Sequence, residues 1–244
     1  MDENTVALVT GGSRGIGAAI ALRLAEDGFD VAITYVNGED AAAAVVGKVE
    51  ALGRHAIAVR ADAADPAAAA LAVERTLQRF GRLDALVNNA GVGVIGPLDG
   101  LELADVDRVL AVNVRASFLA AQAAAGRMGP GGRIVNIGSC MAQRVPGPGG
   151  TLYAMSKSAM IGLTKALARE LGGRGITANV VHPGPVDTDM NPADGPYAGP
   201  QAEMTALGRF AAAPEVAAVV SFLAGPEAAY VTGAEFAVDG GHAA

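Results

Sequence analysis

The stretch TVALVTGGSRGIGAAI, residues 5–20, contains a short apolar run, a glycine-rich turn and the start of a helical pattern, in that order. The apolar run at 5–10 predicts a buried strand, and helical spacing begins directly after the turn. Glycines spaced as Gly11, Gly15 and Gly17 let the backbone approach a pyrophosphate, and the helix start offers free N–H groups to the anion. This order predicts a dinucleotide-binding unit, with a ligand-free glycine turn as the alternative.

The alternation of strand and helix patterns continues along the chain. Apolar runs that predict strands lie at 30–36, 55–61, 83–91, 132–139, 175–184 and 234–238. Helical patterns occupy 15–27, 39–52, 66–80, 102–126 (as two helices), 153–171 and 214–224. Asp65 and Pro66 are expected as the N-cap and the first residue of the third helix. Repeated alternation predicts a parallel sheet with helices on both faces, and because no Pro/Ser-rich linker interrupts it, one domain over 1–244 is expected.

The composition allows a large core and argues against several classes of partner. Apolar residues make up 51% of the chain, so a sizeable core is easily buried. The net charge of −7 argues against generic binding to nucleic acid or an anionic membrane, since both need a basic face. Cys140 is the sole cysteine, so no internal disulfide can form, and the three histidines lack metal-ligand spacing. Because the chain starts acidic and has no apolar run near the ~20 residues of a membrane helix, a cytoplasmic protein without a resident metal is expected.

The end of the second predicted strand bears on the choice of nicotinamide cofactor. An acidic residue at this place typically holds the ribose 2′-OH of NAD. Here the chain has Tyr35 followed by Val36 and Asn37, so no carboxylate repels a 2′-phosphate. Arg14, inside the glycine turn, could reach that phosphate, although no second basic residue follows Tyr35. NADP(H) is therefore favoured over NAD(H).

The pentapeptide YAMSK, residues 153–157, places a tyrosine and a lysine four residues apart. On a helix, Tyr153 and Lys157 would lie on one face, close enough to interact. The pair could be a proton donor with a lysine that controls it, or a plain surface pair on an amphipathic helix.

Several motifs in order make the chain resemble the short-chain dehydrogenase/reductase family over essentially its whole length. They are TGGSRGIG at 10–17, NNAG at 88–91, VNV at 112–114, IVNIGS at 134–139, YAMSK at 153–157, HPGPVDT at 182–188 and VTGAEFAVDGG at 231–241. The C-terminal half, with DTDMNPADGP at 187–196, is similar to bacterial 3-oxoacyl-carrier-protein reductases. It also resembles a cyclic-di-GMP-binding relative that acts in biofilm dispersal.

The resemblance implies a Rossmann-type, doubly wound α/β fold whose seven parallel strands follow the order 3-2-1-4-5-6-7. It also implies a homotetramer, with a dimer as the alternative, in which the helices near 102–126 and 153–171 form the main interface. The implied activity is that of an NADP(H)-dependent oxidoreductase that interconverts a ketone and a secondary alcohol.

The resemblance assigns roles to four catalytic residues. Tyr153 is expected to act as acid/base, and Lys157 to lower the pKa of the phenol and bond the nicotinamide ribose. Ser139 is expected to hydrogen-bond the substrate oxygen, and Asn113 to hold a water that links Lys157 to solvent. From the residues alone, Ser139 could equally cap a loop, and Asn113 could bond its own helix backbone.

The resemblance also assigns the cofactor contacts, including Asp62 on the adenine amine and Pro183 and Gly184 near the nicotinamide amide. As isolated residues, these could be a loop aspartate and simple chain punctuation. The expected cofactor contacts are Gly11, Ser13, Arg14, Gly15, Ile16, Gly17, Tyr35, Asn37, Asp62, Ala63, Asn89, Ala90, Gly91, Tyr153, Lys157, Pro183, Gly184, Val186 and Thr188.

The segment 185–200 is too rich in proline and glycine for a long helix, so a substrate lid over 185–210 is expected. This segment has no basic cluster that would bind a phosphopantetheine carrier, which favours a small neutral ketone as substrate. An alternative function from another class is a sensor on the same fold that binds a nucleotide, cyclic-di-GMP or NADPH, without physiological turnover. The complete set of four catalytic residues weighs against that alternative.

Overall fold

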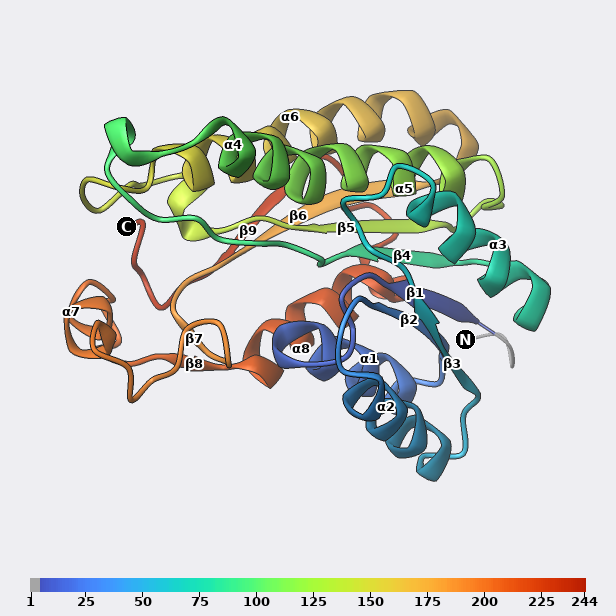
Figure 1. Ribbon diagram of the computed structural model, residues 1–244. Coiled ribbons are helices and arrows are strands. Elements are labelled where there is room, and N and C mark those ends of the chain that lie inside the picture. Colours follow the sequence, from blue (N-terminus) through green and yellow to red (C-terminus); the bar gives the residue numbers. More distant parts are fainter. Residues whose placement is uncertain (1–4) are drawn as a thin grey trace.

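The computed structural model describes residues 5–244 and has a seven-stranded parallel sheet in the order β3-β2-β1-β4-β5-β6-β9 (Figure 1). Its strands are β1 (Val6–Val9), β2 (Asp30–Tyr35), β3 (Ala56–Arg60), β4 (Ala85–Asn88), β5 (Arg133–Ile137), β6 (Thr177–Pro183) and β9 (Glu235–Val238). The predicted fold class and strand order are confirmed, with β9 as the seventh strand. The central strands read as continuous apolar runs because helices cover both of their faces.

Helices form one layer on each side of the sheet (Figure 1). One layer contains α1 (Gly15–Glu26), α2 (Glu39–Ala51) and α8 (Ala213–Ala224), and the other α3 (Ala68–Phe80), α4 (Leu103–Leu110), α5 (Ala116–Ala125) and α6 (Thr151–Leu171). Alternate strand residues supply the two cores. Val31 and Ile33 join the cluster beneath α1, α2 and α8, whereas Leu8 and Ala32 join the cluster beneath α3 and α5.

The strand order reverses between β1 and β4, which pair in parallel. The chain leaves β1 toward one helical layer and leaves β4 toward the other, so a crevice opens at their carboxyl ends. The amide of Asn89 joins the two sides, since its Nδ2 donates to the carbonyl oxygens of Thr10 (2.9 Å) and Gly11 (3.0 Å). The predicted functional residues gather along this edge of the sheet.

In the turn 10–17, two glycines are needed for backbone conformation and Gly17 is needed for packing. Gly11 and Gly15 have positive φ angles of 64° and 53°. A Cβ on Gly17 would lie 2.2 Å from the carbonyl oxygen of Gly11 and 2.5 Å from Nδ2 of Asn89. Gly17 therefore lets α1 start directly against the turn.

One local prediction needs correction, and two other segments gain detail that the sequence pattern did not give. Helix α3 begins at Ala68 rather than Pro66, because Oδ1 of Asp65 accepts the N–H of Ala67 (2.9 Å) and closes a separate turn there. The two helices predicted within 102–126 are α4 and α5, and they are continuous through a π-helical turn, Ala111–Arg115. The segment after β6 contains a short parallel pair, β7 (Val186–Asp187) with β8 (Ala211–Ala212), and a short helix, α7 (Ala198–Glu203).

Among residues 5–244, no helix combines the length and the apolar character needed to cross a membrane. The expectation drawn from the acidic start of the chain rests partly on residues 1–4, which lie outside the described residues.

We expect Gly17→Ala to lower the free energy of unfolding by about 1–3 kcal/mol, because the new methyl group overlaps backbone and amide atoms that the turn holds in place. Urea denaturation measures this change. The matched control is Gly47→Ala within α2, where a Cβ meets nothing within 4 Å; this substitution should stabilise the protein by about 0.5–1 kcal/mol. Equal effects of the two substitutions would contradict the role of Gly17.

Candidate active site

Three of the four predicted catalytic residues converge at the carboxyl end of β5. Ser139 follows this strand, and Tyr153 and Lys157 lie on the first turns of α6. Nζ of Lys157 donates to the carbonyl oxygen of Ile137 (3.0 Å) and lies 5.8 Å from the ring centre of Tyr153. The half-buried phenol of Tyr153 lies near the Ser139 side chain, which opposes the rise that burial causes in the phenol pKa. Gly93, from the loop after β4, lies against the Tyr153 ring, since a Cβ there would be 3.9 Å from ring carbons.

Asn113 lies in the π-helical turn between α4 and α5. Its side chain accepts the N–H of Val92 (2.9 Å) and donates to the carbonyl of Val92 (2.9 Å) and to Oγ of Ser156 (2.9 Å). It therefore joins the loop after β4 to α6, and the alternative of a side chain bonded to its own helix backbone is wrong. π-Helical turns are frequent at functional sites, and this one bulges toward the loop that it holds.

Burial sets the protonation of the site. It lowers the pKa of Lys157 to about 8, because α6 and β5 remove the ammonium from water. It raises the pKa of Tyr153, while the hydrogen bond with Ser139 acts in the opposite direction. Nζ of Lys157 bonds the backbone carbonyl of Ile137, and its expected effect on the phenol pKa stays a prediction.

Two threonines that the sequence analysis missed hold the glycine turn. Oγ1 of Thr34 accepts the N–H of Gly11 (3.0 Å), and Oγ1 of Thr10 accepts the N–H groups of Asn89 and Ala90, both at 3.0 Å. Both threonines stand at or next to strand ends beside the crevice, a position that could have been recognised from the sequence.

The segment after β6 lies over the glycine turn, at the start of α1. A Cβ on Gly15 would lie 3.3 Å from Cγ2 of Thr188, so Thr188 stands over the glycine turn. Gly184 packs on the backbone of Asp239, which leaves no room for a Cβ. Pro183 ends β6 and Val186 is buried in β7. The predicted contacts at 183–188 and those at 11–17 therefore face one cleft.

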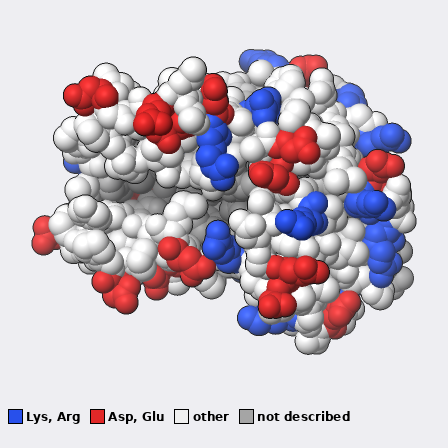
Figure 2. Space-filling model, in the orientation of Figure 1, with Lys and Arg blue, Asp and Glu red and all other residues white. Residues whose placement is uncertain are grey.

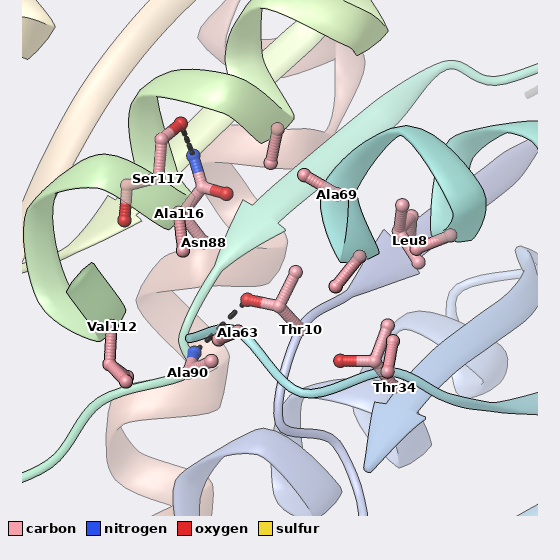
Figure 3. Close-up of a pocket in the computed structure, with 14 residues that line it drawn as sticks. Leu8, Thr10, Thr34, Ala63, Ala69, Asn88, Ala90, Val112, Ala116 and Ser117 are labelled. Atoms are coloured by element: carbon pink, nitrogen blue, oxygen red, sulfur yellow. Dashed lines mark hydrogen bonds between the residues drawn. The ribbon is translucent and has the colours of Figure 1, made fainter. Parts of the chain in front are cut away.

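A pocket with mostly alanine walls lies beside the turn, between β1, β2, β4, α3 and α5 (Figure 3). Its wall includes Ala63 and Ala90 from the predicted cofactor set, and most of the side chains that line it are small. Oδ1 of Asp62 accepts the N–H of Ala64 (2.9 Å), and the guanidinium of Arg115 bonds the Ala64 carbonyl. These bonds hold Asp62 and Ala63 at this pocket. The cradle and the pocket together fit a dinucleotide.

The expected site of the ribose 2′-substituent has more positive charge than the sequence indicated. Arg14 is exposed at the N-cap of α1, and Asn37 is exposed beyond the end of β2. Tyr35, which ends β2, is in register with Arg60, the exposed last residue of β3. Parallel pairing thus adds a second guanidinium near Tyr35, although Arg60 is far from it in sequence.

The other predicted cofactor residues surround the same cleft. Gly91 lies beside Lys157 and Asn113, since a Cβ there would be 3.3 Å from Nζ and 3.5 Å from Oδ1. Ser13 is half-buried in the glycine turn, and Ile16 packs against the core beneath α1. Within residues 5–244, no group of three or more possible metal ligands occurs.

The buried ammonium of Lys157 predicts a pH-dependent difference in stability between the cofactor-free wild type and Lys157→Met. Below pH 8 the folded and unfolded states both carry the charge, so its burial makes the wild type the less stable of the two. From pH about 8 to about 10.4 the folded state loses the proton that the unfolded state keeps. The wild type should therefore gain stability relative to the variant as pH rises through this window.

Urea denaturation at pH 7, 8.5 and 10 measures the difference. Burial raises the pKa of Cys140 to about 11, which destabilises both proteins above pH about 8.5 and cancels in the comparison. The control is Lys48→Met, at an exposed lysine. Its free energy of unfolding should differ from that of the wild type by an amount that does not vary with pH. A constant difference for Lys157→Met would contradict the prediction.

Comparisons with known proteins agree with this geometry. Residues 11–243 match a family model described as enoyl-(acyl carrier protein) reductase. A short-chain dehydrogenase from Burkholderia cenocepacia J2315, solved in complex with NADP, is 57% identical, with a TM-score of 0.97 and 98% of each chain covered. The cyclic-di-GMP-binding biofilm dispersal mediator protein of Escherichia coli (strain K12) is 46% identical, over 96% of this chain and 94% of the relative.

A third relative is the 3-oxoacyl-[acyl-carrier-protein] reductase of Synechocystis sp., which is 42% identical over 97% of this chain and 96% of its own length. The predicted preference for NADP(H) agrees with the NADP complex of the Burkholderia enzyme. On the strength of these matches, the chain belongs to the short-chain dehydrogenase/reductase family of oxidoreductases.

Proposed function

We propose that this protein is an NADP(H)-dependent carbonyl reductase that acts on a small, uncharged ketone. The observation that carries the proposal is the convergence of Ser139, Tyr153 and Lys157 beside the glycine turn. The NADP complex of the Burkholderia relative and the name of the Synechocystis relative support the cofactor and the reaction type.

The bound nicotinamide would supply a hydride to the carbonyl carbon. The Tyr153 phenol donates a proton to the carbonyl oxygen, and the Ser139 hydroxyl hydrogen-bonds the same oxygen as its negative charge grows. Because burial raises the pKa of Tyr153, the phenol keeps its proton at neutral pH, which suits the direction of reduction. Lys157 uses one N–H on the Ile137 carbonyl and keeps two for the ribose hydroxyls or a water.

The segment 185–210 acts as the substrate lid in this proposal. Its base is the β7–β8 pair, where Val186 is in register with Ala211. Within it, the side-chain amides of Asn191 and Gln201 bond each other in both directions, at 2.9 and 3.0 Å, and join α7 to the turn after β7. Because Asn191 and Gln201 both belong to the segment, this pair can move with it as a unit.

The loops around Tyr153 favour an apolar substrate without negative charge. Large apolar side chains are exposed on these loops and on the lid: Ile95, Leu98, Val145, Met190, Tyr197 and Leu207. Figure 2 shows acidic residues on both sides of a hollow in this face. Exposed acids of these segments are Asp99, Glu102, Asp187, Asp189, Asp194 and Glu203. Arg144 bonds the His242 carbonyl (2.6 Å) and Arg209 bonds Glu215. This balance disfavours a phosphorylated or protein-bound acyl group.

A sensor function without turnover remains the alternative, and its support is the name of the Escherichia coli relative. Turnover and binding can be separated experimentally. Calorimetric titration with cyclic-di-GMP, with and without saturating NADPH, would show whether the nucleotide binds and whether it competes for the cofactor cleft.

Self-association and location stay predictions. Leu103, Phe118 and Met155 are exposed on α4, α5 and α6, the helices expected to form the tetramer interface, and this supports association through that layer. Action in the cytoplasm likewise stays a prediction.

We expect Tyr153→Phe to lower kcat for ketone reduction at least 100-fold while NADPH affinity changes less than about threefold, since the variant loses only the proton donor. The rate is measured as NADPH oxidation with simple ketones and free β-ketoesters as substrates. Acetoacetyl-CoA is tested in the same way as a negatively charged substrate for comparison. The control is Tyr230→Phe, at a fully exposed tyrosine, which should leave the rate unchanged. Wild-type activity in Tyr153→Phe would refute the proposed mechanism.

We expect Arg14→Ala and Arg60→Ala each to raise the KM for NADPH about tenfold and to leave the KM for NADH unchanged, since each removes a charge that can pair with the 2′-phosphate. Steady-state kinetics with both cofactors gives the comparison. Arg127→Ala, at an exposed arginine just after α5, serves as the control. Parallel losses with NADPH and NADH would contradict recognition of the phosphate.

A further inference from the structure

His182 is a completely buried histidine on β6, directly behind Ser139, and has no role in the chemistry proposed above. The edge of its ring that carries Nδ1 and Cε1 lies against the chain that leads to the serine. A Cβ on Gly138 would be 2.3 Å from Nδ1 and 2.7 Å from Cε1 of His182, so this place accepts only glycine while the imidazole is there. The close fit makes the ring part of the support of Ser139.

One hydrogen bond and one nearby carboxylate define the protonation state of His182. The backbone N–H of Ser139 donates to Nδ1 (3.2 Å), so Nδ1 carries no proton and the neutral ring has its hydrogen on Nε2. Nε2 lies 3.4 Å from Oε2 of Glu235 on β9, and Oε1 of that carboxylate pairs with Nζ of Lys165 on α6 (2.8 Å). A carboxylate opposite Nε2 favours the hydrogen there and leaves the Nδ1 lone pair for Ser139.

The environment keeps the ring neutral. Burial lowers the pKa of His182, and the ammonium of Lys157 acts in the same direction, whereas Glu235 opposes both. A protonated ring would also present an N–H at Nδ1 to the N–H of Ser139, two donors facing each other.

Three consecutive backbone positions of the active site are therefore held by side chains. The Ile137 carbonyl bonds Lys157, Gly138 is covered by the imidazole, and the Ser139 N–H bonds Nδ1. The Oγ of Ser139 in turn accepts the N–H of Met141 (3.2 Å). Ser139 thus has a defined backbone position before any substrate arrives.

We infer that His182 is a positioning residue for the reduction: its neutral Nδ1 holds the Gly138–Ser139 peptide so that the serine hydroxyl meets the substrate oxygen beside Tyr153. The inference rests on the proposed function, because it requires that Ser139 takes part in the reaction. Small displacements of a positioned group cost orders of magnitude in rate, so one hydrogen bond behind the serine has a measurable effect.

Two substitutions of similar shape separate the hydrogen bond from mere packing. In His182→Asn, the side-chain oxygen occupies the place of Nδ1 and can accept the Ser139 N–H. In His182→Leu, a methyl group occupies that place and accepts nothing. We expect kcat to fall about tenfold in His182→Leu and less than about twofold in His182→Asn, with the KM for NADPH unchanged in both. Thr177→Val, at the buried start of β6, is the packing control and should leave kcat unchanged.

Combination with Ser139→Ala completes the test. If His182 acts through Ser139, His182→Leu should cost about tenfold in the wild-type background and nothing further in Ser139→Ala. Equal losses in both backgrounds, or equal losses for Asn and Leu, would overturn the inference. Should His182→Leu not fold, His182→Ala replaces it with the same expected pattern. Failure of the proposed function would appear separately, as full activity in Ser139→Ala and Tyr153→Phe.

Discussion

The side-chain amide of Asn89 is the interaction on which the cofactor cleft depends. It bonds the carbonyl oxygens of Thr10 and Gly11 and so joins the ends of β1 and β4 at the point where their chains diverge. Diverging strands leave backbone carbonyls without partners from the sheet, and these must find others. The same amide lies against Gly17 in the first turn of α1. A side chain at this position would overlap the amide, so the first turn of the helix requires a glycine there. Turn, helix start and neighbouring loop thus form one rigid unit.

The catalytic side of the cleft depends on a different kind of support. Lys157 is buried with a backbone carbonyl as its partner, an arrangement that lowers its pKa and costs stability while it is charged. A buried cation of this kind is expected where function rather than stability selects the residue. Asn113 and His182 carry similar costs, since each is a buried polar group that is acceptable only because it is hydrogen-bonded. The site is therefore a network of polar groups that hold backbone segments against α6 and β5.

The two halves of the cleft differ in how specific they are. The cofactor half consists mainly of backbone, glycine and alanine, which present N–H groups and space to the shape that dinucleotides share, and only Arg14 and Arg60 at its rim bear on the choice between them. The substrate half consists of loops with exposed apolar and acidic side chains around Tyr153. Loops on a rigid sheet can change their side chains without cost to the fold, so we expect substrate choice to reside in them.

The sequence by itself determined the fold class, the strand order through family resemblance, and the residue types of the cradle and of the Tyr153 pair. These are local properties, because strand and helix periods and glycine spacing are carried by neighbouring residues. Tertiary structure decided what depends on distant partners. Examples are the direction of the Tyr153 pKa shift, Arg60 beside Tyr35, the β7–β8 pair and the bond of His182 to Ser139. The burial of single polar side chains, the register of strands and hydrogen bonds between remote segments have no signature in local sequence, since they exist only after the chain has packed.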